Sequence, residues 1–425
     1  MRNATAKLGL LVMAFAWTAA QQGYSAGMDG PGLAERSGAV ELVPTEAEPM
    51  LTEDAFAACD LMCLPAPFAA NYRPAGPAWY FQLEGMALKR DASGDRTWQA
   101  FVDRTWNRVE NPNYHEDDPD PEDQYIWEWE DTVTHALGTQ DLHFGFQCGG
   151  RALIGRTLGT SHAIEVSYFE VTDWSELAAV RDATEFVDDV DDDGVPDFDN
   201  PFGASLFSPF SDFGDPAIEG LDYNSMARIS YTSSLDNLEW NLRRWILYGP
   251  GQLQASVLAG GRYMNVSERF GYYTESTSPA DASVAVTTNT QNTMLGVQIG
   301  AMFEFFVDPG WWIDCEVKGG VFSNEASQQT VFAPDNVRDY PDRNVGFREE
   351  DVTCWVLDLR LNATVLITPR LAVIGGYHAL WLDGLALASE NMSQDVDVLA
   401  SGPATLVDNG KVVYHGPHLG LTWMW

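Results

Sequence analysis

The C-terminal end of the chain alternates regularly between two rows of side chains. Within residues 412–425, one row of alternate positions ends wholly apolar, with Leu419, Leu421, Trp423 and Trp425. Because successive side chains of a β-strand point to opposite faces, this period of two predicts a strand with one apolar face. Such a face covers a core in a soluble sheet and contacts lipid in a membrane barrel.

The same alternation recurs along the chain and predicts nine further strands. They cover residues 78–90, 141–154, 161–174, 223–248, 253–266, 291–307, 311–322, 352–367 and 371–383. The total of ten depends on residues 223–248, where the apolar row changes from odd to even positions. We interpret this change as a β-bulge within one long strand. A tight turn at Asp236 and Asn237 is the alternative, and it would raise the count to twelve.

The connections between these strands alternate between short and long. The short ones are residues 155–160, 249–252, 308–310 and 368–370, and the long ones are 91–140, 175–222, 267–290, 323–351 and 384–411. In an antiparallel up-and-down barrel, this alternation places all short turns on one rim and all long loops on the other. The sequence therefore predicts an all-β transmembrane barrel over residues 78–425, with both termini on the short-turn rim.

Charged and aromatic residues support a membrane location. A charge facing lipid near the midplane would cost about 2–4 kcal/mol, so charges in the middle of strands should face a polar lumen. Eight residues are predicted there: Glu84, Arg243, Arg262, Glu304, Glu316, Lys318, Asp358 and Arg360. Tryptophans near the short turns predict an aromatic girdle at one membrane interface, formed by Trp79, Trp245, Trp311, Trp423 and Trp425.

The N-terminal end is typical of an exported protein. Residues 1–20 combine Arg2 and Lys7 with a short apolar run, so we expect a cleaved signal peptide. Residues 21–77 have no sustained periodicity and are predicted to form a loosely ordered periplasmic segment. The expected location is the outer membrane. The expected partners are outer-membrane lipid and, through the C-terminal strand, the barrel-assembly machinery.

Negative charge is concentrated in the predicted loops. The formal net charge is −38, and residues 103–131 hold eleven Asp and Glu against two Arg, while residues 173–222 hold fifteen against one Arg. So negative a field excludes nucleic acid as a partner and favours divalent and other cations. The acidic blocks belong in water, which is consistent with long external loops.

One acidic stretch has the spacing of a calcium loop. In "DVDDDGVPDFDN" (residues 189–200), alternate aspartates precede a glycine that permits a sharp turn. The predicted oxygen ligands are Asp189, Asp191, Asp193, the Val195 carbonyl, Asp197 and Asn200. A solvated acidic loop is the alternative. If Ca²⁺ binds, we expect it to order the loop and to have no catalytic role.

Four stretches carry a resemblance to a known family. They are "ISYTSSLDNLEWNLRRW" (229–245), "GGRYMNVSERF" (260–270), "NTQNTMLGVQIGAMFEF" (289–305) and "ITPRLAVIGGYHALWLDGLALA" (367–388). Over roughly residues 140–425, the chain resembles the planctomycete outer-membrane barrels of the beta barrel porin-7 type. The resemblance implies export, insertion into the outer membrane and the porin function for which the family is named.

Three functions remain open at this stage. The first is a porin that passes small solutes or cations, and the second is a non-conducting barrel with an envelope-structural or surface-binding role. The third is a hydrolase on the rim, but the sequence has neither a G-x-S-x-G nor an H-E-x-x-H motif, so we expect no enzyme. Ion pairs across the lumen, such as Arg262–Glu304 or Arg360–Glu316, would favour the closed barrel.

Overall fold

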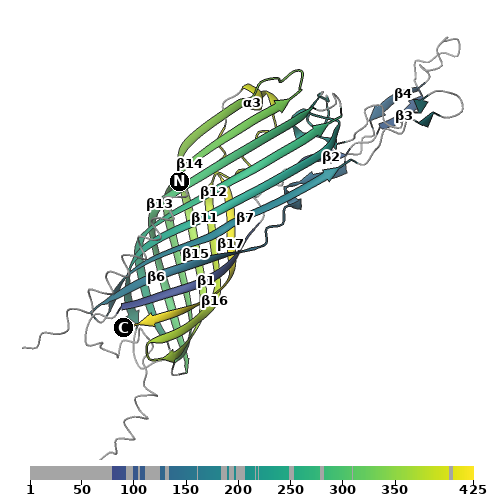
Figure 1. Ribbon diagram of the computed structural model, residues 1–425. Coiled ribbons are helices and arrows are strands. Elements are labelled where there is room, and N and C mark those ends of the chain that lie inside the picture. Colours follow the sequence, from purple (N-terminus) through teal and green to yellow (C-terminus); the bar gives the residue numbers. More distant parts are fainter. Residues whose placement is uncertain are drawn as a thin grey trace, which may run out of the picture.

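Ten antiparallel strands close into a single barrel in the computed structural model (Figure 1). The sheet runs from β12 through β13, β14, β15, β16, β17, β1, β6 and β7 to β11, and β11 pairs with β12 to close it. The strands are β1 (Trp79–Arg90), β6 (Phe146–Leu158), β7 (His162–Arg181), β11 (Asn224–Leu247), β12 (Leu253–Ser276), β13 (Ser283–Asp308), β14 (Trp311–Asp335), β15 (Asn344–Thr368), β16 (Leu371–Leu385) and β17 (Gly410–Met424). This architecture confirms the predicted ten-stranded barrel.

Several short elements accompany the barrel at the loop end. β10 (Leu206–Phe207), β2 (Gln99–Asp103) and β5 (Thr134–Gly138) extend the sheet from β11, while β3 (Trp106–Glu110) pairs with β4 (Tyr125–Trp129). The remaining elements are β8 (Asp189–Val190), which pairs with β9 (Pro196–Asp197), the 3₁₀ turns η2 (Thr139–Asp141) and η3 (Pro209–Ser211), and the helix α3 (Val396–Ser401).

The structure describes residues 79–91, 99–103, 106–110, 125–129, 134–159, 161–182, 189–190, 196–197, 206–215, 217–218, 220–247, 253–277, 282–308, 310–401 and 405–425. Within them, no helix is both long and apolar enough to cross a bilayer. The predicted signal peptide and the segment 21–77 lie outside the described residues.

Both ends of the barrel chain lie on the short-turn rim. Trp79 and Trp425 exchange two backbone hydrogen bonds, at 2.9 and 3.0 Å, which fixes the start of β1 beside the end of β17. The four short connections fall at this same rim because each follows a strand that runs toward it. We call this end of the barrel the turn end and the opposite end the loop end.

Strand β11 settles the choice between ten and twelve strands. It runs without a break through the predicted turn and pairs with β12 in constant register from Met226 to Trp245. The prediction of a bulge within β11 at this point is wrong. The extra residue lies on the neighbouring strand β7, opposite Ser233 to Leu235 of β11, where the register between the two strands shifts. The odd positions of β11 from Ala227 to Trp245 all point into the barrel. Its apolar residues lie on this inward row near the loop end and on the outward row near the turn end, because the surroundings of the outer surface change between the two ends.

Four strands extend well beyond the predicted segments. β12 pairs with β13, and β14 with β15, far past the apolar stretches, so the predicted loops 267–290 and 323–351 are largely strand. The true connections there are only residues 277–282 and 336–343. A transmembrane strand needs about 9–11 residues, and these strands have 24 to 26. The sequence prediction stopped where the lipid-facing apolar row ends.

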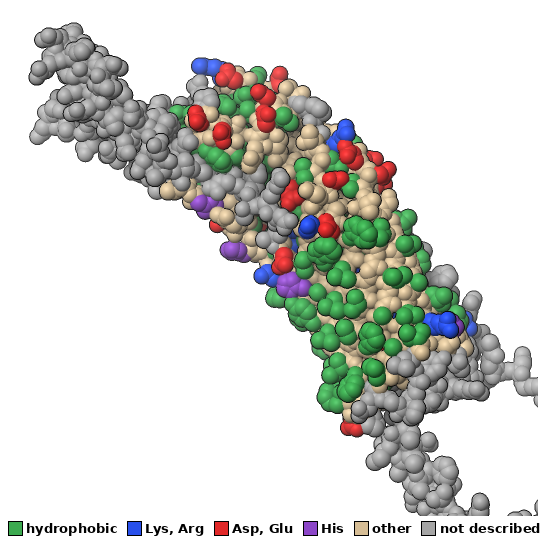
Figure 2. All heavy atoms as spheres, turned by 180° about the vertical axis from the view of Figure 1, so that it is seen from behind, with side chains coloured by type: hydrophobic (Ala, Val, Ile, Leu, Met, Phe, Trp, Pro, Cys, Tyr) green, Lys and Arg blue, Asp and Glu red, His purple; other side chains and the backbone are tan. Residues whose placement is uncertain are grey.

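The barrel therefore has two halves with opposite surfaces, as β13 illustrates. From Leu295 to Val307 its outward residues are apolar and exposed, with Ile299 at 71%. From Ser283 to Thr293 its outward residues are small or polar. We call the part with the apolar outer surface the turn-end half and the rest the loop-end half. Figure 2 shows the apolar side chains gathered over the former and the acidic ones mostly over the latter.

The inside of the loop-end half is an ordinary hydrophobic core. Inward side chains from the whole circumference are fully or almost fully buried there, including Phe270, Met294, Phe322, Phe332 and Leu382. The described parts of the connection between β16 and β17, residues 386–401 and 405–409, fold over this core, and we call them the cap. Gly384, near the end of β16, leads into the cap with a φ of +92°, and a Cβ at this position would lie 2.6 Å from a backbone oxygen of β15.

Candidate functional site: the charged lumen

The structure places all eight predicted lumen charges inside the turn-end half. Each is at least nine-tenths buried, and each lies on the inward row opposite a lipid-facing apolar row. They are Glu84, Arg243, Arg262, Glu304, Glu316, Lys318, Asp358 and Arg360. A buried charge is tolerated only when it is paired, so their partners determine what the lumen can do.

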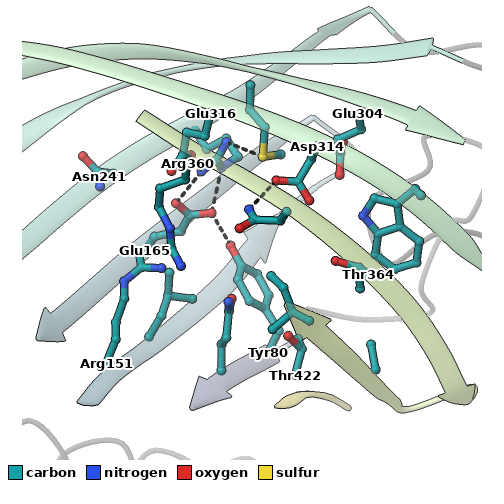
Figure 3. A pocket seen from close by; sticks show the side chains of 18 of the residues that line it. Tyr80, Arg151, Glu165, Asn241, Glu304, Asp314, Glu316, Arg360, Thr364 and Thr422 are labelled. Carbon is teal, nitrogen blue, oxygen red and sulfur yellow. Dashed lines mark hydrogen bonds and ion pairs between the residues drawn. The ribbon is translucent and has the colours of Figure 1, made fainter. Parts of the chain in front are cut away.

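Arg243 of β11 connects two carboxylates on different strands. Its Nε and one terminal nitrogen donate to the two oxygens of Glu165 on β7, at 2.7 and 3.0 Å. That terminal nitrogen also lies 2.6 Å from Glu316 on β14, and the other donates to Ser256 on β12 at 3.0 Å. Tyr80 donates to Glu165 at 2.7 Å, so β1 joins the same network (Figure 3).

A second group of charges crosses the lumen closer to the loop end. Lys318 donates to Glu239 at 2.9 Å and lies 3.4 Å from Asp358. Arg262 donates to Asp358 at 2.9 Å, and His378 lies 3.0 Å from the other oxygen of that carboxylate. Strands β11, β12, β14, β15 and β16 are thus joined through buried side chains.

The pairing differs from the two pairs suggested by the sequence. Arg360 binds Glu84 rather than Glu316, and Arg262 binds Asp358 rather than Glu304. The reason is geometric, because inward positions meet according to the curvature of the closed sheet, which the sequence does not specify. Sequence reasoning also missed four members of the network: Arg151, Glu165, Glu239 and His378. Their positions on inward rows are the signal that could have identified them.

The lumen at this level is nearly full. The cavity beside Arg243 has a volume of about 90 Å³, and its lining includes Tyr80, Arg151, Glu304 and Asp314 (Figure 3). A cavity needs about 10–15 Å³ of space open to a water-sized sphere to hold one water, so this cavity has room for several waters. Such a cavity does not by itself provide a path for solutes.

A further ion pair joins the barrel wall to the cap. Arg90 of β1 lies 2.5 Å from Glu268 of β12, and both side chains are fully buried. Glu268 also accepts hydrogen bonds from Tyr231 at 2.5 Å and from the backbone N–H of Ala388 in the cap at 3.1 Å. Glu268 thereby gives one buried backbone N–H of the cap a hydrogen-bond partner inside a largely apolar region.

The cap has a second anchor on β13. Asn292 donates to the Ala386 carbonyl at 2.9 Å and accepts from the Ala386 N–H at 2.8 Å. Within the cap, Asn391 donates to the Leu387 and Val407 carbonyls. The cap therefore closes the loop-end half with specific hydrogen bonds in addition to its apolar contacts.

A buried carboxyl organises the neighbouring connection between β10 and β11. Asp222 accepts hydrogen bonds from the Ser208 N–H at 3.0 Å, the Ser211 hydroxyl at 2.8 Å and the Ile218 N–H at 2.7 Å. Burial outweighs these bonds and raises the pKa of Asp222 to about 6. This connection should therefore respond to mild acid.

Four of the five residues of the predicted aromatic girdle lie on the outer surface of the barrel at the turn end. Trp311, Trp423 and Trp425 are exposed at the turn end, and Trp79 lies on the same outer surface with Arg156 5.0 Å from its ring. Trp245 is a correction: it is 5% exposed and lies inside the barrel. It shares the inward row of β11 with Arg243, and the sequence prediction assigned it by its distance from the turn alone.

The predicted calcium ligands cannot be placed as a site. Asp189–Val190 and Pro196–Asp197 pair as two short strands, which places the backbone of Asp189 opposite that of Asp197. The side chains of Asp189, Asp191, Asp193, Asp197 and Asn200, together with Val195, lie outside the described residues. Among the side chains that are described, no group of three or more His, Cys, Asp or Glu is arranged to hold a metal ion.

Comparison with known proteins adds a family and several structural likenesses. Residues 223–425 match the family described as "Putative beta barrel porin-7 (BBP7)". The outer membrane protease OmpT from Escherichia coli has 10% identity and a TM-score of 0.40, over 84% of this chain and 100% of that chain. A major outer membrane protein from Thermus thermophilus has 11% identity and a TM-score of 0.25, over 82% and 99%. No curated protein matches.

The family match covers β11 to β17 and agrees with the resemblance seen in the strand patterns. The printed description of the family names a beta barrel porin, and the expectation that the chain is no enzyme stays a prediction. The planctomycete lineage stays a prediction. The chain is a closed ten-stranded antiparallel β-barrel, and its residues 223–425 match the beta barrel porin-7 family.

Proposed function

We propose that this barrel does not conduct in its resting state and that its loop-end half, with the acidic loops, is the working surface for an envelope-structural or binding role. One observation carries the proposal: the interior is blocked twice in succession. Buried ion pairs fill the turn-end half, and a hydrophobic core under the cap fills the loop-end half. A solute could pass only if both the ion pairs and the packing of the hydrophobic core were disrupted.

The buried ion pairs make it energetically costly to open a path through the turn-end half. Removing one partner of a buried pair costs about 3–5 kcal/mol because the remaining charge is left uncompensated. Arg243 and Lys318 each contact more than one carboxylate, so opening a path past either would break several interactions together. Spontaneous opening should therefore be rare.

A gated porin is the second candidate, and the family match supports it. In that case the cap would move and the ion pairs would rearrange in response to a ligand or a membrane potential. Its distinguishing property is conductance that appears under a stimulus and disappears without it.

The predicted surroundings of the barrel belong to the same proposal. Export through a signal peptide, insertion by the barrel-assembly machinery and contact with outer-membrane lipid would deliver the chain to the membrane. Ca²⁺ bound at residues 189–200 would order an external loop. The apolar, exposed outer surface of the turn-end half supports the lipid contact.

Planar-bilayer conductance of the refolded protein tests the proposal. We expect no steady conductance from the wild type across a range of voltages. Combining Asn292→Ala in the cap anchor with Arg262→Ala and Lys318→Ala in the lumen should produce open events, because these changes weaken both blocks. Arg244→Ala, at the outward neighbour of Arg243, is the control and should remain silent. Steady conductance from the wild type would refute the proposal and make the protein an open porin.

A further inference from the structure

The buried charges of the turn-end lumen do not balance. The described inward residues there include seven carboxylates, namely Glu84, Glu165, Glu239, Glu304, Asp314, Glu316 and Asp358. They include five permanent cations, namely Arg151, Arg243, Arg262, Lys318 and Arg360. Arg151 lies 3.6 Å from Glu84. Together with the ion pairs described above, this pair uses all five cations and leaves Glu304 and Asp314 without one.

These two carboxylates are direct neighbours. Glu304 on β13 and Asp314 on β14 are register partners, and both point into the lumen (Figure 3). Glu304 is 1% exposed, and its Oε2 atom is buried without a hydrogen-bond partner. Asp314 accepts a hydrogen bond from Asn362 at 2.6 Å. Two ionised carboxylates side by side in a buried site are strongly unfavourable unless a cation neutralises them.

The space beside them has a suitable size and chemistry. Both carboxylates line the cavity of about 90 Å³, which has room for several waters. Mg²⁺ characteristically keeps several waters and binds through one or two carboxylates. We propose that Glu304 and Asp314 bind one partly hydrated divalent cation of the Mg²⁺ type at the turn end of the lumen. The cation supplies the missing positive charge and ties β13 to β14 beside their short turn.

This site is separate from the acidic loops and does not depend on whether the barrel conducts. It lies inside the barrel wall, whereas the predicted calcium motif at residues 189–200 lies in the connection between β7 and β11. A closed or an open lumen could each contain it. The competing explanation for the charge excess is that the two carboxyl groups retain a proton.

Mn²⁺ binding measured by electron paramagnetic resonance tests the site, because Mn²⁺ replaces Mg²⁺ at carboxylate and water ligands. The full-length refolded protein is compared with the Glu304→Gln/Asp314→Asn variant in the same detergent. The amide replacements nearly preserve shape and remove the repulsion, so we expect the variant to fold. The slower gel migration of boiled barrel checks this, and the single Glu304→Gln variant provides a milder change.

A matched control comes from the loop-end half of the same sheet. Glu325 of β14 and Asp351 of β15 are also direct register partners, but both are exposed on the outer surface. The Glu325→Gln/Asp351→Asn variant also removes one Glu and one Asp charge, but from a surface that is exposed to water. It therefore reports how far surface carboxylates alone contribute to Mn²⁺ binding.

We expect the Glu304/Asp314 variant to lose one tightly bound Mn²⁺ per chain, while the control retains it and Mg²⁺ displaces it from the wild type. Mg²⁺ should also raise the thermal unfolding midpoint of the wild type and the control, but not that of the lumen variant, because ligand binding stabilises the native state. Equal Mn²⁺ stoichiometry and affinity in the wild type and the lumen variant would overturn the proposal and leave the retained proton as the explanation.

Discussion

Strand β13 passes through both halves of the barrel, and the two halves divide its side chains in opposite ways. In the turn-end half, Val297 and Phe303 point outward while Gln298 and Glu304 point inward. In the loop-end half, the outward positions are polar or small and the inward ones, such as Val286, include the apolar residues. The period of two never changes. The solvent outside the wall decides which row is apolar, since lipid accepts an apolar surface and water does not.

The difference also determines what stabilises each half. The loop-end half gains from the burial of apolar area, as a water-soluble barrel does. The turn-end half places its apolar area in lipid and fills its interior with ion pairs that favour a single arrangement. Changes at equivalent strand positions in the two halves should therefore have different effects.

The largest effect is expected from breaking the ion pairs of the turn-end half. Arg243→Ala leaves Glu165 without its cation and leaves Glu316 with Lys318 alone, so it should lower the free energy of unfolding by about 3–5 kcal/mol. Arg244→Ala, at the adjacent outward position, should cost about 1 kcal/mol or less, as exposed charges do. Urea unfolding in lipid vesicles measures both. Equal costs would show that the lumen network contributes nothing beyond a surface charge.

The core of the loop-end half should be almost as sensitive to a different kind of change. Leu382→Ala removes a fully buried apolar side chain and should cost about 2–5 kcal/mol. Leu357→Ala, on the lipid-facing row of β15, leaves no cavity in a packed core and should cost less. The same unfolding assay compares them. A larger loss for Leu357→Ala would contradict the assignment of the core to the loop-end half.

A charge on the outer surface of β13 should distinguish lipid from water. Val297→Arg places a charge in the apolar belt and should cost about 2–4 kcal/mol near the membrane midplane. Asn289→Arg places it on the same outward row of the same strand, in the loop-end half, and should cost almost nothing. Folding yield into vesicles and urea midpoints provide the measurement. Similar costs at both positions would contradict the placement of the edge of the lipid-facing surface of β13 at Leu295.

The smallest expected effect is a pH dependence confined to the loop end. The pKa of Asp222 is raised to about 6, above its value in the unfolded chain, so the native state keeps a proton that the unfolded state has already lost. Its contribution therefore becomes more favourable as the pH falls from about 7 through 6 toward 4. Hydrogen exchange of the Ser208 and Ile218 amides should slow relative to the intrinsic rate over this range. Asp222→Asn should remove the dependence.

The sequence predicted the features that depend on local alternation. The ten strands, the shared rim of the short turns and the inward orientation of the eight charges follow from a period of two and from connection lengths. The extended ends of β12 and β13 were missed because their apolar side chains face inward, where polar residues were expected. The partners of Arg262 and Arg360, and the inward position of Trp245, depend on the closure of the sheet.

Site-directed spin labelling along β13 tests the central claim most directly. Single cysteines are placed at successive positions from 284 to 306 in a chain whose native Cys148, Cys315 and Cys354, together with Cys59 and Cys63, have been replaced by Ser or Ala. Accessibility to oxygen reports lipid, and accessibility to a soluble nickel complex reports water. Our account predicts oxygen access at odd positions from 295 onward, nickel access at odd positions up to 293, and protection from both at even positions throughout. Nickel access at even positions in the turn-end half, such as 298, 300 and 302, would reveal a water-filled lumen and contradict the closed barrel.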